Sequence, residues 1–328
     1  MIPAVLNIKN LNVRFATPDG EVTAVSDLSL SVAKGECLGI VGESGSGKSQ
    51  TFMAAMGLLA QNGRAAGEVA FGDVNLLTAG ESVLNTLRGD KLTMIFQDPM
   101  TSLTPHMRVG RQLTEVLVRH RGLSAAAARD QVIAMLRRVQ IAEPERRFAM
   151  YPHELSGGLR QRIMIAMALL CDPALIIADE PTTALDVTVQ AQILDLIRRA
   201  KDELGTSVVL ITHDLGVVAG LADRVAVMYA GRIVEEGLVH QVFKSPRHPY
   251  TKGLLACTPR LDDSTAGALL TIPGQPPNLQ RLPGGCAYHP RCPVVLDRCR
   301  SERPALLPAA GGGLSACWRD APRAGIAP

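Results

Sequence analysis

The stretch GESGSGKS at residues 42–49 overlaps the end of the apolar run CLGIVG at 37–42, and a helical segment begins near Lys48. The stretch matches the G-x4-G-K-S/T pattern of a phosphate-binding loop, in the strand–loop–helix context that gives the pattern its meaning. Glycines at these positions let successive backbone N–H groups converge on phosphate oxygens at a helix N-terminus. The sequence therefore predicts a nucleotide site, with Lys48 on the β- and γ-phosphates and the Ser49 hydroxyl on Mg²⁺.

A second apolar strand delivers two carboxylates. The run ALIIADE at 174–180 ends with Asp179 and Glu180. A phosphate loop needs a carboxylate for its metal ion and, in hydrolases, a group that orients the attacking water. We expect Asp179 to hold Mg²⁺ through its water shell and Glu180 to act as general base, a role worth about 10²–10⁴ in rate.

Strands and helices alternate along much of the chain. SVVLITHD at 207–214 is a further buried strand, and residues 107–150 have the period of surface helices. The helix before the 207–214 strand has Asp186 as its predicted N-cap and Gly205 as its predicted C-cap. This alternation predicts an α/β fold with a mainly parallel sheet covered on both faces.

The two ends of the chain depart from this alternation. Residues 5–32 alternate apolar and polar around the turn TPDG, which predicts an antiparallel β region with one buried face. After Gly237 proline and glycine become more frequent and the periodicity fades. We therefore expect a nucleotide-binding domain at 1–237, with a helical subdomain at about 98–160, and a small, separately organised extension at 238–328.

Composition limits the class of protein. The chain has 328 residues, 47% apolar and 20% charged, as in soluble globular proteins. A formal net charge of +3 without a long basic run argues against a nucleic-acid partner. The most apolar stretch, at 163–171, is shorter than the ~18 residues of a membrane span, and the N-terminus lacks the layout of a secretory signal. We expect a cytosolic protein whose clustered cysteines are reduced thiols or metal ligands.

The stretch LSGGLRQR at 155–162 belongs to a set of motifs that follow one another along the chain in the order found in a known family. With it, the chain resembles the ATP-binding cassette (ABC) ATPases over about residues 1–237. The other motifs that carry the resemblance are GESGSGKS, Gln97 in IFQDP, Asp179-Glu180, TALD at 183–186 and His213 in ITHD. The resemblance implies a P-loop NTPase core with an antiparallel β subdomain, an inserted α-helical subdomain and, here, a small C-terminal cysteine-rich region. It also implies ATP hydrolysis with ATP and Mg²⁺ as cofactors.

The resemblance assigns roles in catalysis. His213 would contact the γ-phosphate and hold the attacking water with Glu180, and Gln97 would contact Mg²⁺ and water while leading into the helical subdomain. Asp186 would lie between two subunits and couple their sites. A signature group would cap the γ-phosphate bound by the opposite subunit, and it consists of Ser156, Gly157, Gly158 and Gln161.

The resemblance also assigns binding residues. The implied ATP-binding residues are Phe15, Gly42, Ser44, Gly45, Gly47, Lys48, Ser49 and Gln50, and the implied magnesium ligands are Ser49, Gln97 and Asp179. Phe15 fits equally as an aromatic that stacks on adenine and as a core residue of its strand. Gln50 and Leu159 depart from the residues usual in the family, but neither departure removes a ligand.

Features outside the ATP site narrow the class. The interval between phosphate loop and signature is short and lacks sustained heptads, as in transporter ATPases. The stretches at 95–105, 245–255, 272–279 and 285–292 resemble the dipeptide/oligopeptide importer branch, which nickel importers share. The branch implies a peripheral subunit on the cytoplasmic face of the inner membrane. Its implied partners are two polytopic membrane subunits, a homologous second ATPase in a heterodimer and, indirectly, a substrate-binding protein. The alternatives are a nickel or other small-solute importer ATPase and a soluble ABC ATPase without a transport role.

Four cysteines gather near the C-terminus with the spacing C-x5-C-x6-C-x17-C, namely Cys286, Cys292, Cys299 and Cys317. Structural zinc sites usually contain a C-x2-4-C pair, and this spacing has none. Four cysteines also suit a [4Fe–4S] cluster, which tolerates wider spacing because it is larger than one ion. The importer resemblance points the same way, and His289 could replace one ligand. Zinc, and a set of reduced thiols without metal, remain alternatives.

Overall fold

The computed structural model describes residues 3–98, 102–183, 185–257 and 271–320. Residues 99–101 of the expected motif at 95–105 and Ala184 of TALD lie outside the described residues. The chain divides into two compact units. The first comprises Met1–Val5, Val32–Cys37 and Thr78–Leu210, and the second comprises Leu6–Ser31, Leu38–Leu77 and Ile211–Pro328.

The first unit contains a three-strand group in the order β6, β7, β8. These strands are β6 (Leu92–Ile95), β7 (Leu175–Asp179) and β8 (Ser207–Ile211), and every residue in them is buried. β6 and β7 are parallel, with Leu92 opposite Leu175. Short apolar strands buried on both faces are typical of a parallel sheet covered by helices. The predictions of buried strands at 174–180 and 207–214 are thus confirmed.

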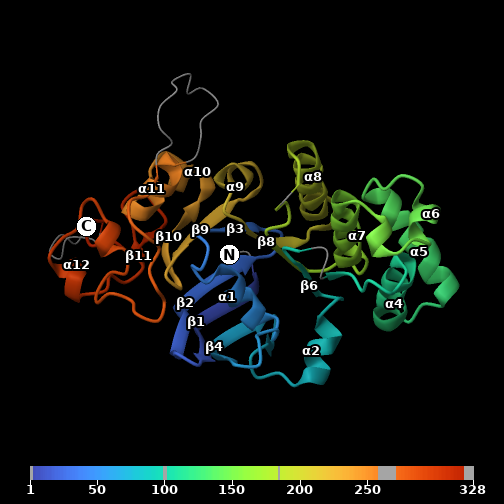
Figure 1. The fold of residues 1–328 in the computed structure, drawn as a ribbon, viewed down its shortest axis with the longest axis horizontal. Coiled ribbons are helices and arrows are strands. Elements are labelled where there is room, and N and C mark those ends of the chain that lie inside the picture. The colour runs from blue at the N-terminus through green and yellow to red at the C-terminus, as the bar shows by residue number, and fades with distance from the viewer. Residues whose placement is uncertain (1–2, 99–101, 184, 258–270, 321–328) are drawn as a thin grey trace. The chain divides into compact units, whose positions relative to one another are not determined.

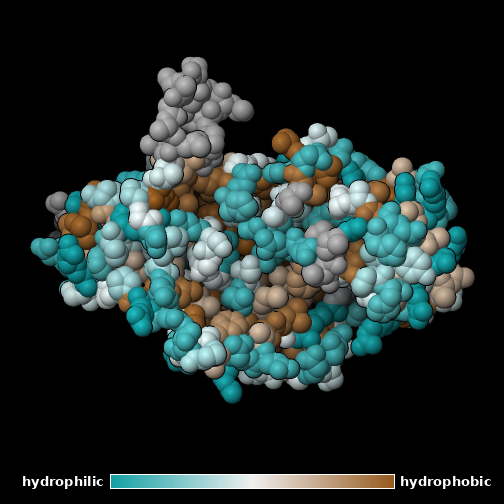
Figure 2. All heavy atoms as spheres, viewed as in Figure 1, coloured by the Kyte–Doolittle hydropathy of each residue, from teal (hydrophilic) through white to brown (hydrophobic). Residues whose placement is uncertain are grey.

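The helices of the first unit include the helical region that the sequence predicts at 107–150. They are α2 (Glu81–Leu87), α4 (Val109–Arg121), α5 (Ala125–Arg138), α6 (Pro144–Phe148), the short 3-10 helix η1 (Pro152–Glu154), α7 (Gly157–Leu169) and α8 (Val187–Leu204). Helices α4 to α7 pack together (Figure 1). The outer side of this group is mainly hydrophilic on the face in Figure 2, as expected for amphipathic surface helices.

Side-chain caps fix where α8 begins and ends. The Asp186 carboxylate accepts a hydrogen bond of 2.9 Å from the Val189 amide, and Gly205 closes the helix with φ +67°. An oxygen at the N-cap satisfies a backbone donor that the helix itself leaves unpaired, and glycine tolerates the left-handed C-cap conformation. Both predicted caps are confirmed.

The second unit contains a four-stranded sheet in the order β2, β1, β4, β5 (Figure 1). The strands are β1 (Ala4–Thr17), β2 (Gly20–Ala33), β4 (Gly63–Phe71) and β5 (Val74–Asn75). β1 and β4 are antiparallel, with Leu6 opposite Phe71. The β region predicted at 5–32 is confirmed, and β4 and β5 extend it by segments that the sequence analysis did not identify.

The second unit also contains five strands in the order β11, β12, β10, β9, β3. They are β3 (Cys37–Val41), β9 (Arg224–Tyr229), β10 (Arg232–Leu238), β11 (Leu307–Pro308) and β12 (Leu314–Ser315). Its helices are α1 (Lys48–Ala55), α9 (Leu215–Leu221), α10 (Val239–Lys244), α11 (Pro249–Ala256), η2 (His289–Arg291) and α12 (Arg298–Ser301). β3 is parallel to β9, and β9 is antiparallel to β10.

The segment after Gly237 shares its core with the strands before it. β12 pairs with β10, placing Ser315 opposite Glu235. Tyr250 and Tyr288 pack in one buried cluster with Tyr229 of β9. A strand that covers a sheet edge satisfies backbone groups that would otherwise remain unpaired. The described part of the segment at 238–328 thus adds a strand to the edge of this sheet and two tyrosines to its buried cluster.

Among the described residues, no helix combines the length and apolar character needed to cross a membrane.

Candidate active site

The phosphate loop leaves the buried strand β3 and enters α1 through positions that only glycine fits. A Cβ atom at Gly42 would lie 2.2 Å from the Met228 carbonyl oxygen, and one at Gly47 would lie 2.3 Å from the Ala24 carbonyl oxygen. Gly47 also has φ +96°, which side chains rarely adopt. Close backbone packing therefore explains both glycines and holds the base of the loop in place.

Lys48 begins α1 and is buried. Its ammonium nitrogen Nζ donates hydrogen bonds to the carbonyl oxygens of Gly42 at 2.8 Å and Glu43 at 3.0 Å. Ser44 and Gly45 are exposed at the tip of the loop, and Ser49 and Gln50 are half-buried in the first turn of α1. A helix N-terminus and a lysine on one loop make an anion site, as the phosphates of a nucleotide require.

The predicted catalytic carboxylates lie at the end of β7. Asp179 is buried and Glu180 is half-buried with φ +46°, a strained value for a residue with a side chain. The Gln97 amide nitrogen donates to Glu180 Oε2 at 3.1 Å, and the Thr183 hydroxyl donates to the same oxygen at 2.8 Å. Gln97 and Glu180, two predicted site residues, are thus in direct contact. The role of Thr183 was missed, although its place within TALD was a signal.

The signature group lies at the N-terminus of α7. Ser156 and Gly157 are exposed, and the Ser156 hydroxyl caps the helix by accepting from the Leu159 amide. Gly158 faces Val189, which a Cβ there would approach to 3.1 Å. Gln161 is buried instead, and its side-chain nitrogen donates to the Pro181 carbonyl at 2.6 Å. Gln161 therefore ties α7 to the segment after Glu180, whereas Ser156 and Gly157 remain open to a ligand.

His213 and Phe15 are accessible in the second unit. His213 is exposed two residues after the end of β8, and the next residue, Asp214, caps α9 by accepting from the Gly216 amide at 2.8 Å. Phe15 is half-buried on β1, and its ring lies so close to Gly63 that a Cβ there would approach it to 2.7 Å. The half-buried ring is compatible with both predicted roles, stacking on a base and packing in the core, so the assignment of Phe15 stays a prediction.

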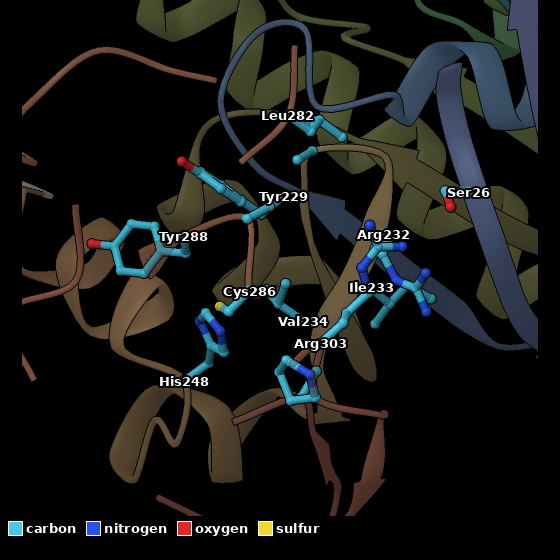
Figure 3. Close-up of a pocket in the computed structure, with 14 residues that line it drawn as sticks. Ser26, Tyr229, Arg232, Ile233, Val234, His248, Leu282, Cys286, Tyr288 and Arg303 are labelled. Carbon is cyan, nitrogen blue, oxygen red and sulfur yellow. The ribbon is translucent and has the colours of Figure 1, made fainter. Parts of the chain in front are cut away.

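All four clustered cysteines, Cys286, Cys292, Cys299 and Cys317, line one small cavity of about 20 Å³. Burial, with a smaller contribution from the neighbouring thiols of Cys299, Cys292 and Cys317, raises the pKa of the Cys286 thiol to about 11. Cys286 also lies beside His248 and Tyr288 at the apolar pocket of Figure 3. Within the described ranges, no three histidine, cysteine or acidic side chains are arranged to hold a single metal ion. The four cysteines thus share one cavity, and their role as ligands of a metal group stays a prediction.

Comparison with known proteins places these features in a family. Residues 25–183 match the ABC transporter family, and residues 234–299 match the oligopeptide/dipeptide transporter C-terminal region. The chain is 57% identical to the oligopeptide transport ATP-binding protein OppD of Salmonella typhimurium, over 96% of this chain and 93% of OppD. It is 49% identical to the dipeptide transport ATP-binding protein DppD of Bacillus subtilis, over 98% and 96%.

Solved structures give the same class. The dimeric, post-hydrolysis structure of the ATP-binding cassette MJ0796 bound to ADP and Pi superposes with a TM-score of 0.65 at 28% identity, over 71% of this chain and 98% of that one. The fold and the site thus define an ABC ATPase with a P-loop NTPase core, as the sequence predicts. The chain belongs to the family of oligopeptide and dipeptide transport ATP-binding proteins.

Proposed function

We propose that this chain hydrolyses ATP to energise the import of oligopeptides or dipeptides through separate membrane subunits. The observation that carries the proposal is the presence, in one chain, of an ABC transporter match and a peptide-transporter C-terminal match. The relatives named for oligopeptide and dipeptide transport agree over nearly the whole chain. Nickel import remains the alternative to peptide import.

We propose the following division of work at the ATP site. Lys48 and the N-terminus of α1 bind the phosphates, and Ser49 and Asp179 hold Mg²⁺, which neutralises phosphate charge. Glu180 accepts the proton of the attacking water, and His213 holds that water. Gln97 and Thr183 keep the Glu180 carboxylate in one orientation, as their shared hydrogen bonds to Oε2 suggest. Because Gln97 leads into the segment before α4, a shift of that segment would reorient the base.

We propose further that two such cassettes pair head to tail, each with its signature group on the nucleotide of the other. Exposed Ser156 and Gly157 at the start of α7 support this pairing, because their helix N-terminus can take a phosphate. Val187, next to Asp186, is an apolar side chain 83% exposed in the single chain, as interface residues often are. The expected partner is a homologous second ATPase, and the assembly would lie on the cytoplasmic side of the inner membrane with a substrate-binding protein outside.

We propose a [4Fe–4S] cluster as the group that the four cysteines hold. Their convergence on one cavity supports a shared ligand. When bound, the cluster would stabilise a segment rich in loops, and the thiols would hold it as thiolates.

Co-purification with the encoded membrane subunits, followed by ATPase assays, tests the proposal. We expect two polytopic proteins to co-purify and a peptide-loaded binding protein to stimulate hydrolysis. Stimulation by a nickel-loaded binding protein instead would support the nickel alternative. Hydrolysis without any membrane partner in the complex would support a soluble ABC ATPase.

A further inference from the structure

Glu43, the second residue of the phosphate loop, is held by the C-terminal segment through both its side chain and its backbone. Arg291 forms a two-pronged ion pair with the Glu43 carboxylate, with Nη1 2.7 Å from Oε2 and Nη2 2.9 Å from Oε1. The Tyr250 hydroxyl accepts a hydrogen bond of 2.8 Å from the Glu43 amide. Planar pairs of this kind fix geometry as well as charge.

Arg291 is itself held rigidly. Its side chain is only 5% exposed, and its Nε donates to the Pro273 carbonyl at 2.9 Å. The guanidinium carbon lies 6.0 Å from the ring centres of Tyr229 and Tyr288, whose rings Figure 3 shows at one pocket. The two terminal nitrogens of the Arg291 guanidinium group are therefore held in a fixed position against the loop.

Tyr250 is equally fixed. It is fully buried, and its ring centre lies 4.6 Å from that of Tyr229 and 5.4 Å from that of Tyr288. Aromatic groups packed in this way lose little further freedom when they make a hydrogen bond. The side chains of Arg291 and Tyr250, which both contact Glu43, are thus held in place by the same cluster of tyrosines.

The constraint reaches the residue that binds phosphate. The Glu43 carbonyl accepts from Lys48 Nζ at 3.0 Å. A fixed Glu43 backbone therefore fixes one of the two carbonyls that position the lysine ammonium. The C-terminal segment also lies close to the loop at a second place, where both line a cavity of about 120 Å³. The lining residues include Glu43, Ser44, Gly45 and Ser46 of the loop and Pro276, Pro277 and Leu279 of the C-terminal segment.

We propose that Arg291 and Tyr250 are positioning residues for ATP binding, acting on Lys48 and the loop amides through Glu43. The phosphate loop then depends on the C-terminal segment for its conformation. Loss of structure in that segment would therefore weaken the binding of ATP. This inference rests on the proposed ATP site and adds residues that the catalytic motifs do not include.

Four variants of the full chain test the proposal: Arg291→Gln, Glu43→Gln, the double variant, and Arg298→Gln as a matched control. Arg298 pairs with Glu302 on the surface of the same segment. With Mg²⁺ and ATP as the probe, we expect Arg291→Gln to raise the Kd about 10-fold, as for loss of a charge-assisted pair. The double variant should bind no more weakly than Arg291→Gln alone, because both changes remove one interaction.

Amide hydrogen exchange distinguishes a local change in the phosphate loop from a change in the stability of the whole protein. Arg291→Gln should speed exchange across residues 42–49 while β7 exchanges as in the wild type. Tyr250→Phe removes only the hydroxyl, and we expect its Kd to rise about 3-fold. If Arg291→Gln does not fold, the Kd of Tyr250→Phe tests whether the C-terminal segment positions the loop. A folded variant with wild-type affinity and wild-type loop exchange would overturn the proposal. Wild-type protein that does not bind ATP would instead count against the proposed function.

Discussion

The Gln97 amide donates a 3.1 Å hydrogen bond to the Glu180 carboxylate, joining residues 83 positions apart in sequence. Gln97 follows β6 and Glu180 follows β7, and these strands are parallel neighbours. Parallel strands end at one edge of a sheet, which is where α/β proteins gather functional groups. The Thr183 hydroxyl donates to the same oxygen, and two donors on one oxygen orient the carboxylate, as its proposed role of general base requires.

Replacing Glu180 by glutamine should lower kcat by about 10²–10⁴, because the amide has the shape of the carboxylate but accepts no proton from water. ATP should still bind, and the ATP-bound dimer should accumulate. Phosphate release and ATP titration measure the two effects. Glu203→Gln is the matched control, since Glu203 pairs with Arg138 at the surface. A normal hydrolysis rate in Glu180→Gln would remove Glu180 from the role of base.

Replacing Thr183 by valine should lower kcat about 3- to 10-fold at unchanged KM, because the loss of one hydrogen bond leaves the Glu180 carboxylate less well oriented. Valine has the shape of threonine but lacks the hydroxyl. Thr183→Ser keeps the donor and should hydrolyse ATP at nearly the wild-type rate. Steady-state kinetics on both variants separate the hydrogen bond from packing. Equal losses in the serine and valine variants would show that packing is responsible.

Asp186 has two roles that substitution can separate. Asp186→Ala should cost about 1 kcal/mol of unfolding free energy, since α8 loses its side-chain cap. Asp186→Asn keeps a capping oxygen and should unfold near the wild-type temperature. If the charge couples two sites, the asparagine variant should still hydrolyse ATP more slowly. Thermal unfolding and ATPase assays measure both effects, and wild-type hydrolysis by Asp186→Asn would argue that Asp186 only caps the helix.

The metal content of the protein tests the role of the cysteine cavity. Protein purified without oxygen should contain about four irons and four sulfides per chain and absorb near ~400 nm. Cys292→Ser should lose most of the iron, whereas Cys257→Ser should keep it, because Cys257 does not line the cavity. One zinc per chain, or no metal, would rule out the cluster.

The fold was predictable where the signal is local. The strands β3, β7 and β8 are short apolar runs, and each leads into a recognisable motif. β4 was missed because its first six residues are partly or fully exposed and alternation appears only near its end. β12, with two residues, carries no periodic signal, and its pairing with β10 depends on chain contacts that sequence pattern does not reveal.

In the site, too, residues within local motifs could be predicted, whereas contacts between residues distant in sequence could not. Glu180 and Lys48 stand in motifs whose chemistry limits the residue type, and Gln97 was assigned through the resemblance to ABC ATPases. Arg291 and Glu43 are 248 positions apart, and neither residue type nor spacing links them. The four cysteines could be predicted to form one group because their residue type is rare in the chain and all four lie near its C-terminus. Which ligand they hold depends on geometry that the spacing alone leaves open.

Uptake of a labelled oligopeptide tests transport most directly. The chain, its second ATPase and the membrane subunits would be reconstituted in liposomes, with the peptide and its binding protein on one side and ATP on the other. We predict accumulation of peptide that requires ATP hydrolysis and that Glu180→Gln abolishes. Robust ATP hydrolysis without peptide accumulation, or accumulation of nickel in place of peptide, would contradict the proposed function.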